Sequence, residues 1–278
     1  APLYLAFAGG DLAMIHDTSM SNLREAHWRI TYNLAYDVYR DERYAWLINH
    51  FETSREPRKR PGLPIFLQQH RGSCDFVRLR TVEYPAVKMD YGRDAQFAQT
   101  GIHAGRCSLF PVHGTAVLRS KRGPGATILW GPHSAGHQDP AALHVDLHTG
   151  SGRITAGVIV ASYGESLHLD WCRTTIAHNT VTVDEQAMVP YDRPTESPWE
   201  CDHWRDTITD GTLELLMAER GHKIVRASNS AVYPGVRLDR TLIVTDDYIL
   251  DTFRTISDEV HTYDYAMHLS GALAQPGT

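Results

Sequence analysis

Short runs of apolar residues, separated by polar and turn-forming residues, fill the chain from residue 63 onward. The runs recur at intervals of roughly ten residues, a spacing typical of antiparallel strands packed as a sandwich. Runs of this kind are Thr115–Leu118, Thr127–Trp130, Leu213–Met217, Lys223–Ala227, Arg240–Val244 and Tyr248–Phe253. The pattern therefore predicts a mainly β fold, with an antiparallel β-sandwich over residues 63–278.

A helical period precedes these strands. Residues Asp17 to Ser19 offer helix caps, and apolar positions then recur at helical spacing as far as Phe51. We expect two antiparallel helices within residues 17–52. The basic, proline-bearing run Thr53–Gly62 is typical of a solvated linker, so the predicted domains are residues 1–62 and 63–278.

Ligand-type side chains gather between Gly131 and Asp184. Burying an imidazole or carboxylate without a partner costs several kcal/mol, so such a cluster suggests a functional site. The alternation of apolar and polar residues in Leu143–Leu147 predicts a strand with one face on the core. The almost wholly apolar run Ile154–Val160 predicts a strand that is covered on both faces. In a third strand, ending at Val183, the same period places His178 and Asn179 on opposite faces.

The charge, hydrophobicity and cysteine content of the chain disfavour several classes of binding partner and structure. The 278 residues are 42% hydrophobic and carry a formal net charge of −6, which gives no general attraction to nucleic acid or to an anionic membrane. No apolar run reaches the roughly eighteen residues of a membrane span. Four cysteines without a CxxC spacing indicate neither a zinc knuckle nor a disulfide framework. We expect both termini to be cut edges of a longer protein.

Four segments resemble, in order, the sandwich half of heparinase II/III-like polysaccharide lyases. They are Phe110–Arg119, Gly131–Leu147, Tyr163–Asp184 and Tyr233–Asp251, and the sequence AHNTVTVD within the third is the most specific. Upstream, Gly10–Thr18 is similar to the loop that closes the family's (α/α) toroid. The resemblance implies that residues 1–62 hold the last toroid helices and a linker, and that most of the toroid lies outside this sequence.

The resemblance also implies a chemistry, the cleavage of uronic-acid polysaccharides such as glycosaminoglycans or alginate by β-elimination. It suggests His137, Tyr163 and Arg173 as catalytic residues. Arginine suits a uronate carboxylate because its guanidinium is a planar fork, whereas a phenol needs cationic neighbours to act as a base near neutral pH. His133 and Asn179 are the implied substrate-binding residues. We expect this sequence alone to be inactive, since the acid–base pair would lie in the toroid.

A metal site is the third implication. The family binds zinc through the second histidine of an HxH motif, a later aspartate and the histidine of the AHN segment. Aligned without a gap, Asp139 and Gly157 replace the first two ligands and His178 matches the third. In the family the substrate groove lies between the toroid and the sandwich, and the first alignment places His137 there. A second alignment makes His137 a ligand and places His133 in the groove. The candidate ligands are therefore His137, Asp139 and His178, and we predict weak or absent zinc because a protein site normally needs three or four donors.

Two other functions stay open. One is a non-catalytic carbohydrate-binding or structural sandwich, and the other is a cupin-like metal-binding domain built on the same three candidate ligands. We expect an acidic polysaccharide or oligosaccharide as partner, leave a homodimer open, and expect a periplasmic or secreted protein. The other histidines of the stretch, His144, His148 and His168, receive little weight because an isolated histidine is usually solvated or hydrogen-bonded in a core.

Overall fold

The computed structural model describes residues 6, 7, 11–13, 23, 26–40, 44, 107–131, 138–150, 152–156, 165–189, 209–219 and 221–271. The chain divides into two compact units, Asn22–Asp94 on one side, and Ala1–Ser21 with Ala95–Thr278 on the other. The predicted boundary at residue 62 lies outside the described residues and stays a prediction.

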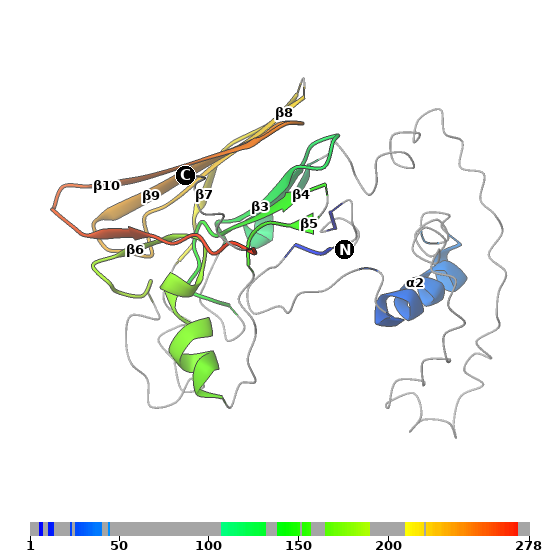
Figure 1. Cartoon of the computed structure of the whole chain (residues 1–278), viewed down its shortest axis with the longest axis horizontal. Coiled ribbons are helices and arrows are strands. Elements are labelled where there is room, and N and C mark those ends of the chain that lie inside the picture. The colour runs from blue at the N-terminus through cyan, green and yellow to red at the C-terminus, as the bar shows by residue number, and fades with distance from the viewer. Residues whose placement is uncertain are drawn as a thin grey trace, which may run out of the picture. The chain divides into compact units, whose positions relative to one another are not determined.

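The smaller unit contains the helix α2, Ala26–Tyr39, which lies within the range predicted to be helical (Figure 1). Tyr32 is buried in this unit, and its ring centroid lies 5.8 Å from that of Tyr44, which is itself helical. Most of the second predicted helix, after Tyr44, lies outside the described residues.

The larger unit is the predicted antiparallel sandwich, and its first sheet has the order β1-β2-β3-β4-β5. The strands are β1 Ser108–Phe110, β2 Thr115–Arg119, β3 Gly125–Leu129, β4 Val145–Thr149 and β5 Gly152–Arg153. The 3₁₀ turn η1, Pro111–His113, joins β1 to β2. All of these pairings are antiparallel, as the strand pattern predicted.

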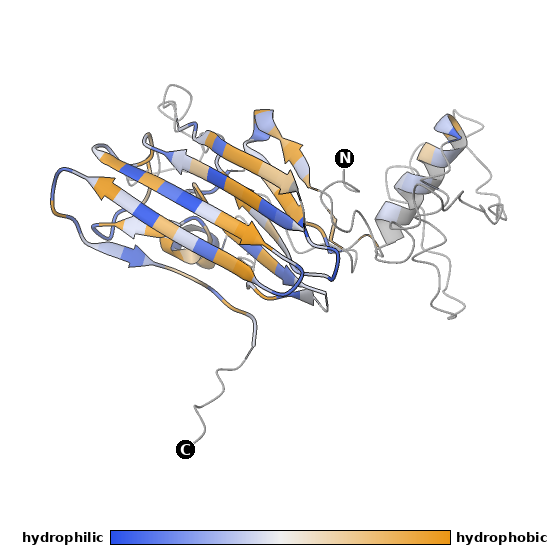
Figure 2. Cartoon of the chain, turned by 90° about the horizontal axis from the view of Figure 1, so that it is seen from above, coloured by the Kyte–Doolittle hydropathy of each residue, from blue (hydrophilic) through white to orange (hydrophobic). Residues whose placement is uncertain are grey.

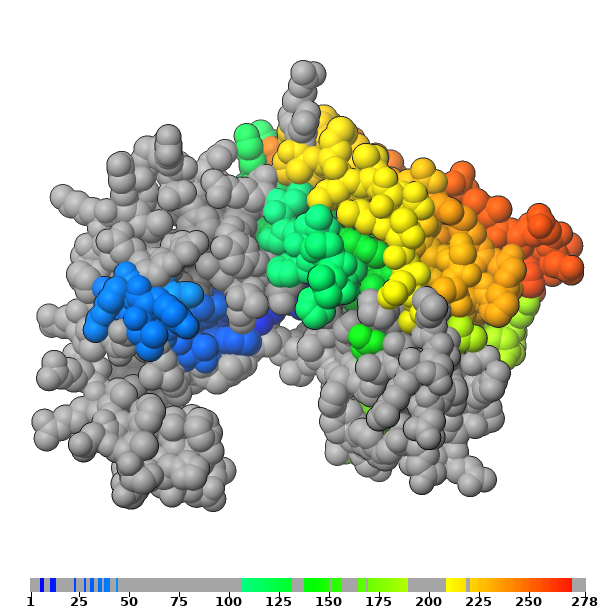
Figure 3. Space-filling view, turned by 180° about the vertical axis from the view of Figure 1, so that it is seen from behind, coloured from blue at the N-terminus to red at the C-terminus, as the bar shows by residue number. Residues whose placement is uncertain are grey.

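The second sheet has the order β10-β9-β8-β7. Its strands are β7 Thr212–Glu219, β8 His222–Asn229, β9 Val236–Val244 and β10 Ile249–Ser257. A separate two-stranded pair joins β6, Val181–Val183, to β11, Tyr263–Tyr265. Figure 3 shows β7 and β8 in yellow beside the green strands β1 to β3, followed by β9 and β10 in orange.

The main core lies between the two sheets. It unites inward residues of β2 to β4, such as Leu118 and Ile128, with inward residues of β8 and β9, such as Val225 and Leu242. Apolar and polar residues alternate along the long strands (Figure 2), and alternate residues of β9, such as Leu238 and Leu242, face this core.

The first sheet is buried on its other face as well. Val117 of β2 packs there against Phe7 and Ala13, and the ring of Phe7 stacks on His148 with the centroids 3.6 Å apart. The one-sided pattern predicted for Leu143–Leu147 is therefore wrong, because His144, Asp146 and His148 are buried too. Inside this layer the carboxylate of Asp146 accepts hydrogen bonds from Arg153 and Thr155.

Two other strand predictions need correction. Within the described part of the predicted strand Ile154–Val160, Thr155 forms only an isolated bridge to Leu269. The strand β6 begins at Val181, so His178 and Asn179 precede it and do not alternate as strand residues. Instead, His178 ends the 3₁₀ turn η3, Thr175–Ala177.

Candidate functional site

A buried pair formed by His178 and Asp139 lies where η3 leads into β6. The Nδ1 atom of His178 is 2.9 Å from the carbonyl oxygen of Thr174. A carbonyl only accepts hydrogen bonds, so Nδ1 carries a proton and Nε2 of the neutral ring has a bare lone pair. That Nε2 lies 3.5 Å from Oδ2 of Asp139, with both side chains 5% exposed. It has no hydrogen-bond partner among the described residues.

Nε2 of His178 and Oδ2 of Asp139 are both hydrogen-bond acceptors. Burying them face to face is unfavourable unless a proton or a metal cation lies between them. Either a second proton makes His178 an imidazolium paired with Asp139, or the pair holds a cation. Zinc lies about 2.0–2.2 Å from nitrogen and oxygen ligands, so two tetrahedral ligands stand roughly 3.3–3.5 Å apart. The observed 3.5 Å separation fits two such ligands.

The fit to zinc is incomplete within the described part of the chain. There, no three His, Cys, Asp or Glu side chains are grouped closely enough to hold a metal ion. The pair supplies two donors, whereas a protein zinc site normally has at least three. A further donor would have to come from outside the described residues.

The neighbouring His144 is buried and neutral. Its ring meets that of His178 edge-on, with the centroids 5.7 Å apart. Burial lowers the pKa of His144 well below its ordinary value, and the positive charge that His178 can carry lowers this pKa further. In agreement with a neutral ring, Nδ1 of His144 accepts a hydrogen bond from the backbone N–H of Asn179 at 3.1 Å.

The side chain of Asn179 connects β4 to the segment after β11 through hydrogen bonds. Its side chain donates to the carbonyl oxygen of Val145 at 2.9 Å and accepts from the backbone N–H of His268 at 2.7 Å. Asn179 is 1% exposed. This geometry gives Asn179 a positioning task and speaks against the direct contact with substrate implied by the family resemblance.

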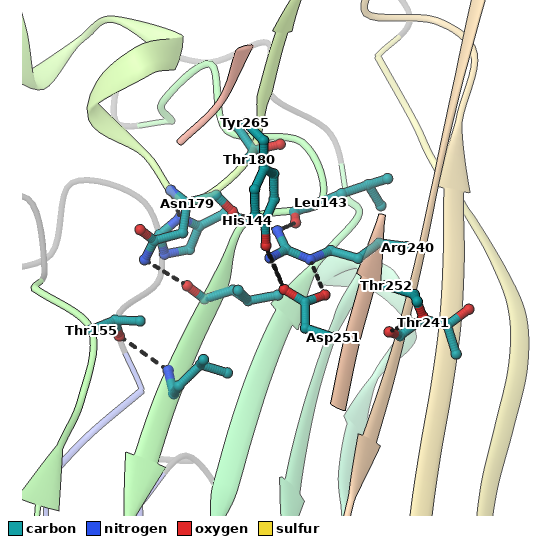
Figure 4. Close-up of polar contacts among 12 residues, drawn as sticks. Leu143, His144, Thr155, Asn179, Thr180, Arg240, Thr241, Asp251, Thr252 and Tyr265 are labelled. Carbon is teal, nitrogen blue, oxygen red and sulfur yellow. Dashed lines mark hydrogen bonds and ion pairs between the residues drawn. The ribbon is translucent and has the colours of Figure 1, made fainter. Parts of the chain in front are cut away.

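The structure adds a residue that the sequence analysis did not single out, Arg240 of β9. It is fully buried, and its guanidinium contacts Asp251, Tyr265 and the backbone beside both histidines (Figure 4). One signal in the sequence could have revealed it. Arg240 occupies an inward position of β9, between Leu238 and Leu242, where the alternation calls for an apolar residue.

The remaining predicted site residues are only partly placed. Arg173 is half-buried directly after the π-helical turn η2, His168–Cys172, and its backbone N–H donates to the carbonyl oxygen of His168 at 3.1 Å. His133, His137 and Tyr163 lie outside the described residues. The described structure thus brings Asp139, His178 and Asn179 into one region, and the assembly of the other predicted residues stays a prediction.

The fold is that of a class of polysaccharide lyases, which confirms at the level of the fold the resemblance to heparinase II/III-like enzymes. A heparinase III gene product matches 99% of this chain with a TM-score of 0.64 and 14% identity, over 34% of its own length. The heparan sulfate lyase HepC from Pedobacter heparinus matches 96% of this chain with a TM-score of 0.62 and 13% identity.

Both structures are much longer than this chain, which covers 34% of the first and 33% of the second. The chain thus spans about a third of the length of the structures that it matches. No family model matches the sequence, and no curated protein matches it.

Proposed function

We propose that the chain is the sandwich portion of a polysaccharide lyase that cleaves uronic-acid-containing glycans by β-elimination. The observation that carries this proposal is the correspondence of nearly the whole chain with the heparinase III and heparan sulfate lyase structures. The buried pair of His178 and Asp139 adds support, because its members come from two of the four segments that resemble the family, Gly131–Leu147 and Tyr163–Asp184.

The proposed reaction needs four events at one glycosidic bond of a uronate residue. A base removes the proton at C5, the freed electron pair forms the C4–C5 double bond, and the bond from C4 to its glycosidic oxygen breaks. The leaving oxygen receives a proton. Charge that develops on the uronate carboxylate must be neutralised by donors that are already in place.

We assign the proposed roles to residues of the sandwich as follows. His137 reaches into the substrate groove beside the acid–base pair of the toroid, where an imidazole can carry a positive charge near neutral pH. Arg173 binds the uronate carboxylate through its planar fork. Tyr163 is a further proposed catalytic residue, and His133 is a proposed substrate-binding residue. Asn179 shapes this region from inside through its bonds to Val145 and His268.

The spacing between Asp139 and His178 favours the alignment in which Asp139 takes the place of a metal-binding histidine and His137 faces the substrate. Zinc bound there would supply a fixed positive charge next to the groove. In its absence, protonated His178 would supply that charge against Asp139, 3.5 Å away.

We also propose that the enzyme meets its acidic glycan outside the cytoplasm, in the periplasm or after secretion. No helix among the described residues is long and apolar enough to cross a membrane. Self-association as a homodimer stays a prediction, and light scattering of the purified chain would test it.

The experiment compares two proteins, the 278-residue chain and the longest reading frame that contains it. Each is mixed with heparan sulfate, hyaluronan or alginate, and the ultraviolet absorbance of the unsaturated uronate is followed. We expect turnover by the longer protein and little or none by the chain alone. Robust turnover by the chain alone would place the chemistry within the sandwich. Glycan binding without cleavage by either protein would make the sandwich a binding module.

A variant of the longer protein tests the role of His137. The change His137→Ala should lower turnover by about 10²-fold or more, the usual size of a lost acid–base or charge-stabilising contact. Its melting temperature should stay within a few degrees of the parent, since surface changes typically alter stability by about ±0.5 kcal/mol. A variant with full activity, or one that unfolds early, would remove His137 from the chemistry.

A further inference from the structure

We propose that Arg240 is a positioning residue that sets the relative placement of His144 and His178. The relevance of these histidines to catalysis rests on the proposed lyase function, whereas the effect of Arg240 on their positions does not. Arg240 lies on β9 of the second sheet, whereas the two histidines lie on loops that flank β4 and β6. A single side chain thus connects the second sheet to both loops of the site.

Every N–H of the Arg240 guanidinium has an acceptor. Nε and Nη2 donate to the two carboxylate oxygens of Asp251 at 2.9 and 2.5 Å, and Nη2 also donates to the hydroxyl oxygen of Tyr265 at 2.9 Å. Nη1 donates to the carbonyl oxygens of Leu143 at 2.8 Å and Asn179 at 2.5 Å. Five donors on one rigid plane therefore define the orientation of the group completely.

The two backbone contacts fall next to the histidines in the sequence. Leu143 immediately precedes His144, and Asn179 immediately follows His178. Since Nη1 binds both carbonyl oxygens, it fixes the distance between the two loops from which the rings project. The hydrogen bond from the Asn179 N–H to His144 Nδ1 spans the same gap.

Leu143 needs such a contact because its backbone is strained. Its φ of +59° lies in the left-handed region, which is sterically unfavourable for residues with a Cβ atom. The conformation is local to the turn before β4 and turns the Leu143 carbonyl toward Arg240 (Figure 4). The guanidinium thus stabilises the backbone conformation from which His144 starts.

A contribution to stability does not by itself explain why the ion pair of Arg240 and Asp251 is buried. Replacement of a buried ion pair by well-packed apolar residues is often neutral or stabilising, so a retained pair often contributes geometric specificity. The guanidinium also lies over the rings of Phe253 and Tyr265, at 5.2 and 5.5 Å from their centroids. Lysine at this position would keep the charge but could not reach the same five acceptors.

The test uses the 278-residue chain with ¹⁵N-labelled histidine, and NMR reads which ring nitrogen of each histidine carries the proton. The variants His144→Gln and His178→Gln assign the two rings. We expect the parent chain to show an acceptor Nδ1 in His144 and a protonated Nδ1 in His178. In Arg240→Lys, near-ultraviolet circular dichroism should stay native-like, while the acceptor signal of His144 Nδ1 is lost or split between two tautomers.

A matched control is available on the neighbouring strand. Arg226 of β8 forms a similar bidentate pair with Asp239, on the opposite face of the sheet from Arg240. The change Arg226→Lys should leave both histidine spectra as in the parent. A folded Arg240→Lys protein with parental histidine spectra would overturn the proposal, as would equal changes in both variants.

A milder variant covers the case in which Arg240→Lys does not fold. Tyr265→Phe removes one acceptor of the guanidinium at a half-exposed position, and we expect a smaller change in the same two histidine spectra. An unfolded Arg240→Lys together with a Tyr265→Phe spectrum identical to the parent would reduce Arg240 to a residue of the core. None of these measurements requires glycan cleavage, so failure of the lyase assignment would be seen separately.

Discussion

Asn179 forms hydrogen bonds with other parts of the protein. Its backbone N–H donates to Nδ1 of His144, and its side chain bonds to the backbone of Val145 and His268. The sequence analysis selected this residue because it follows His178 in the AHN segment. Its partners could not be predicted, because they come from β4 and from the segment after β11, which only the tertiary fold brings together.

The change Asn179→Ala should therefore act through stability. It deletes one buried and one partly buried hydrogen bond and removes the Asn179 partner of the Val145 carbonyl and of the His268 N–H, which should cost roughly 2–4 kcal/mol of unfolding free energy. Urea titration followed by circular dichroism measures this loss. The exposed Thr252→Ala serves as control and should stay within about 0.5 kcal/mol of the parent.

The prediction of weak zinc binding rests on the pair of Asp139 and His178. Two donors at a suitable spacing bind zinc weakly, so we expect clearly less than one zinc per chain after purification without added metal. Emission spectrometry of the parent, Asp139→Ala and His178→Ala proteins measures the content. Near-stoichiometric zinc in the parent, lost in both variants, would show a complete site and contradict the prediction of weak binding.

At the scale of elements, hydrophobic alternation predicted the strands of the second sheet but misjudged β4. Strands β7 to β10 each have a face that is more exposed than the other, so period two is visible in their residues. The strand β4 is covered on both sides because Phe7 packs over His148. A local pattern carries no information about a covering segment that comes from another part of the chain.

The outer face of the second sheet carries an ion-pair cluster with a pH dependence. Hydrogen bonds from Arg226, together with the charges of Arg226 and Arg254, lower the pKa of Asp239. A carboxyl whose folded-state pKa lies below its unfolded value of about 3.9 stabilises the fold above that pH. This stabilisation is lost as the pH falls through the folded-state pKa.

We accordingly expect the unfolding free energy to decline as the pH is lowered from about 5, and Asp239→Asn to make that decline shallower. Urea titrations at a series of acidic pH values measure both slopes. Asp146 also has a lowered pKa, because its bonds to His148 and the charge of Arg153 outweigh the effect of burial, so part of the slope should remain. An unchanged slope in Asp239→Asn would exclude the cluster as a source of acid sensitivity.

At the scale of the whole molecule, the β-sandwich and the family resemblance could be predicted from the sequence, and the structure confirms both at the level of the fold. The spacing of the short apolar runs and the AHN segment were sufficient for this prediction, because both can be recognised in short stretches of sequence. The site was predicted only in part. Arg240 joins β9 to the loops before β4 and β6, and such a connection depends on how the two sheets stack.

The mass of the products tests the proposed β-elimination most directly. The longest reading frame that contains this chain is incubated with a uronate polysaccharide, and the released oligosaccharides are examined by mass spectrometry. Elimination predicts that each new non-reducing end lacks one water relative to a hydrolysis product and carries an unsaturated uronate. Products with saturated ends would show hydrolysis, and intact polysaccharide across the substrates tested would show that the sandwich belongs to a protein without lyase activity.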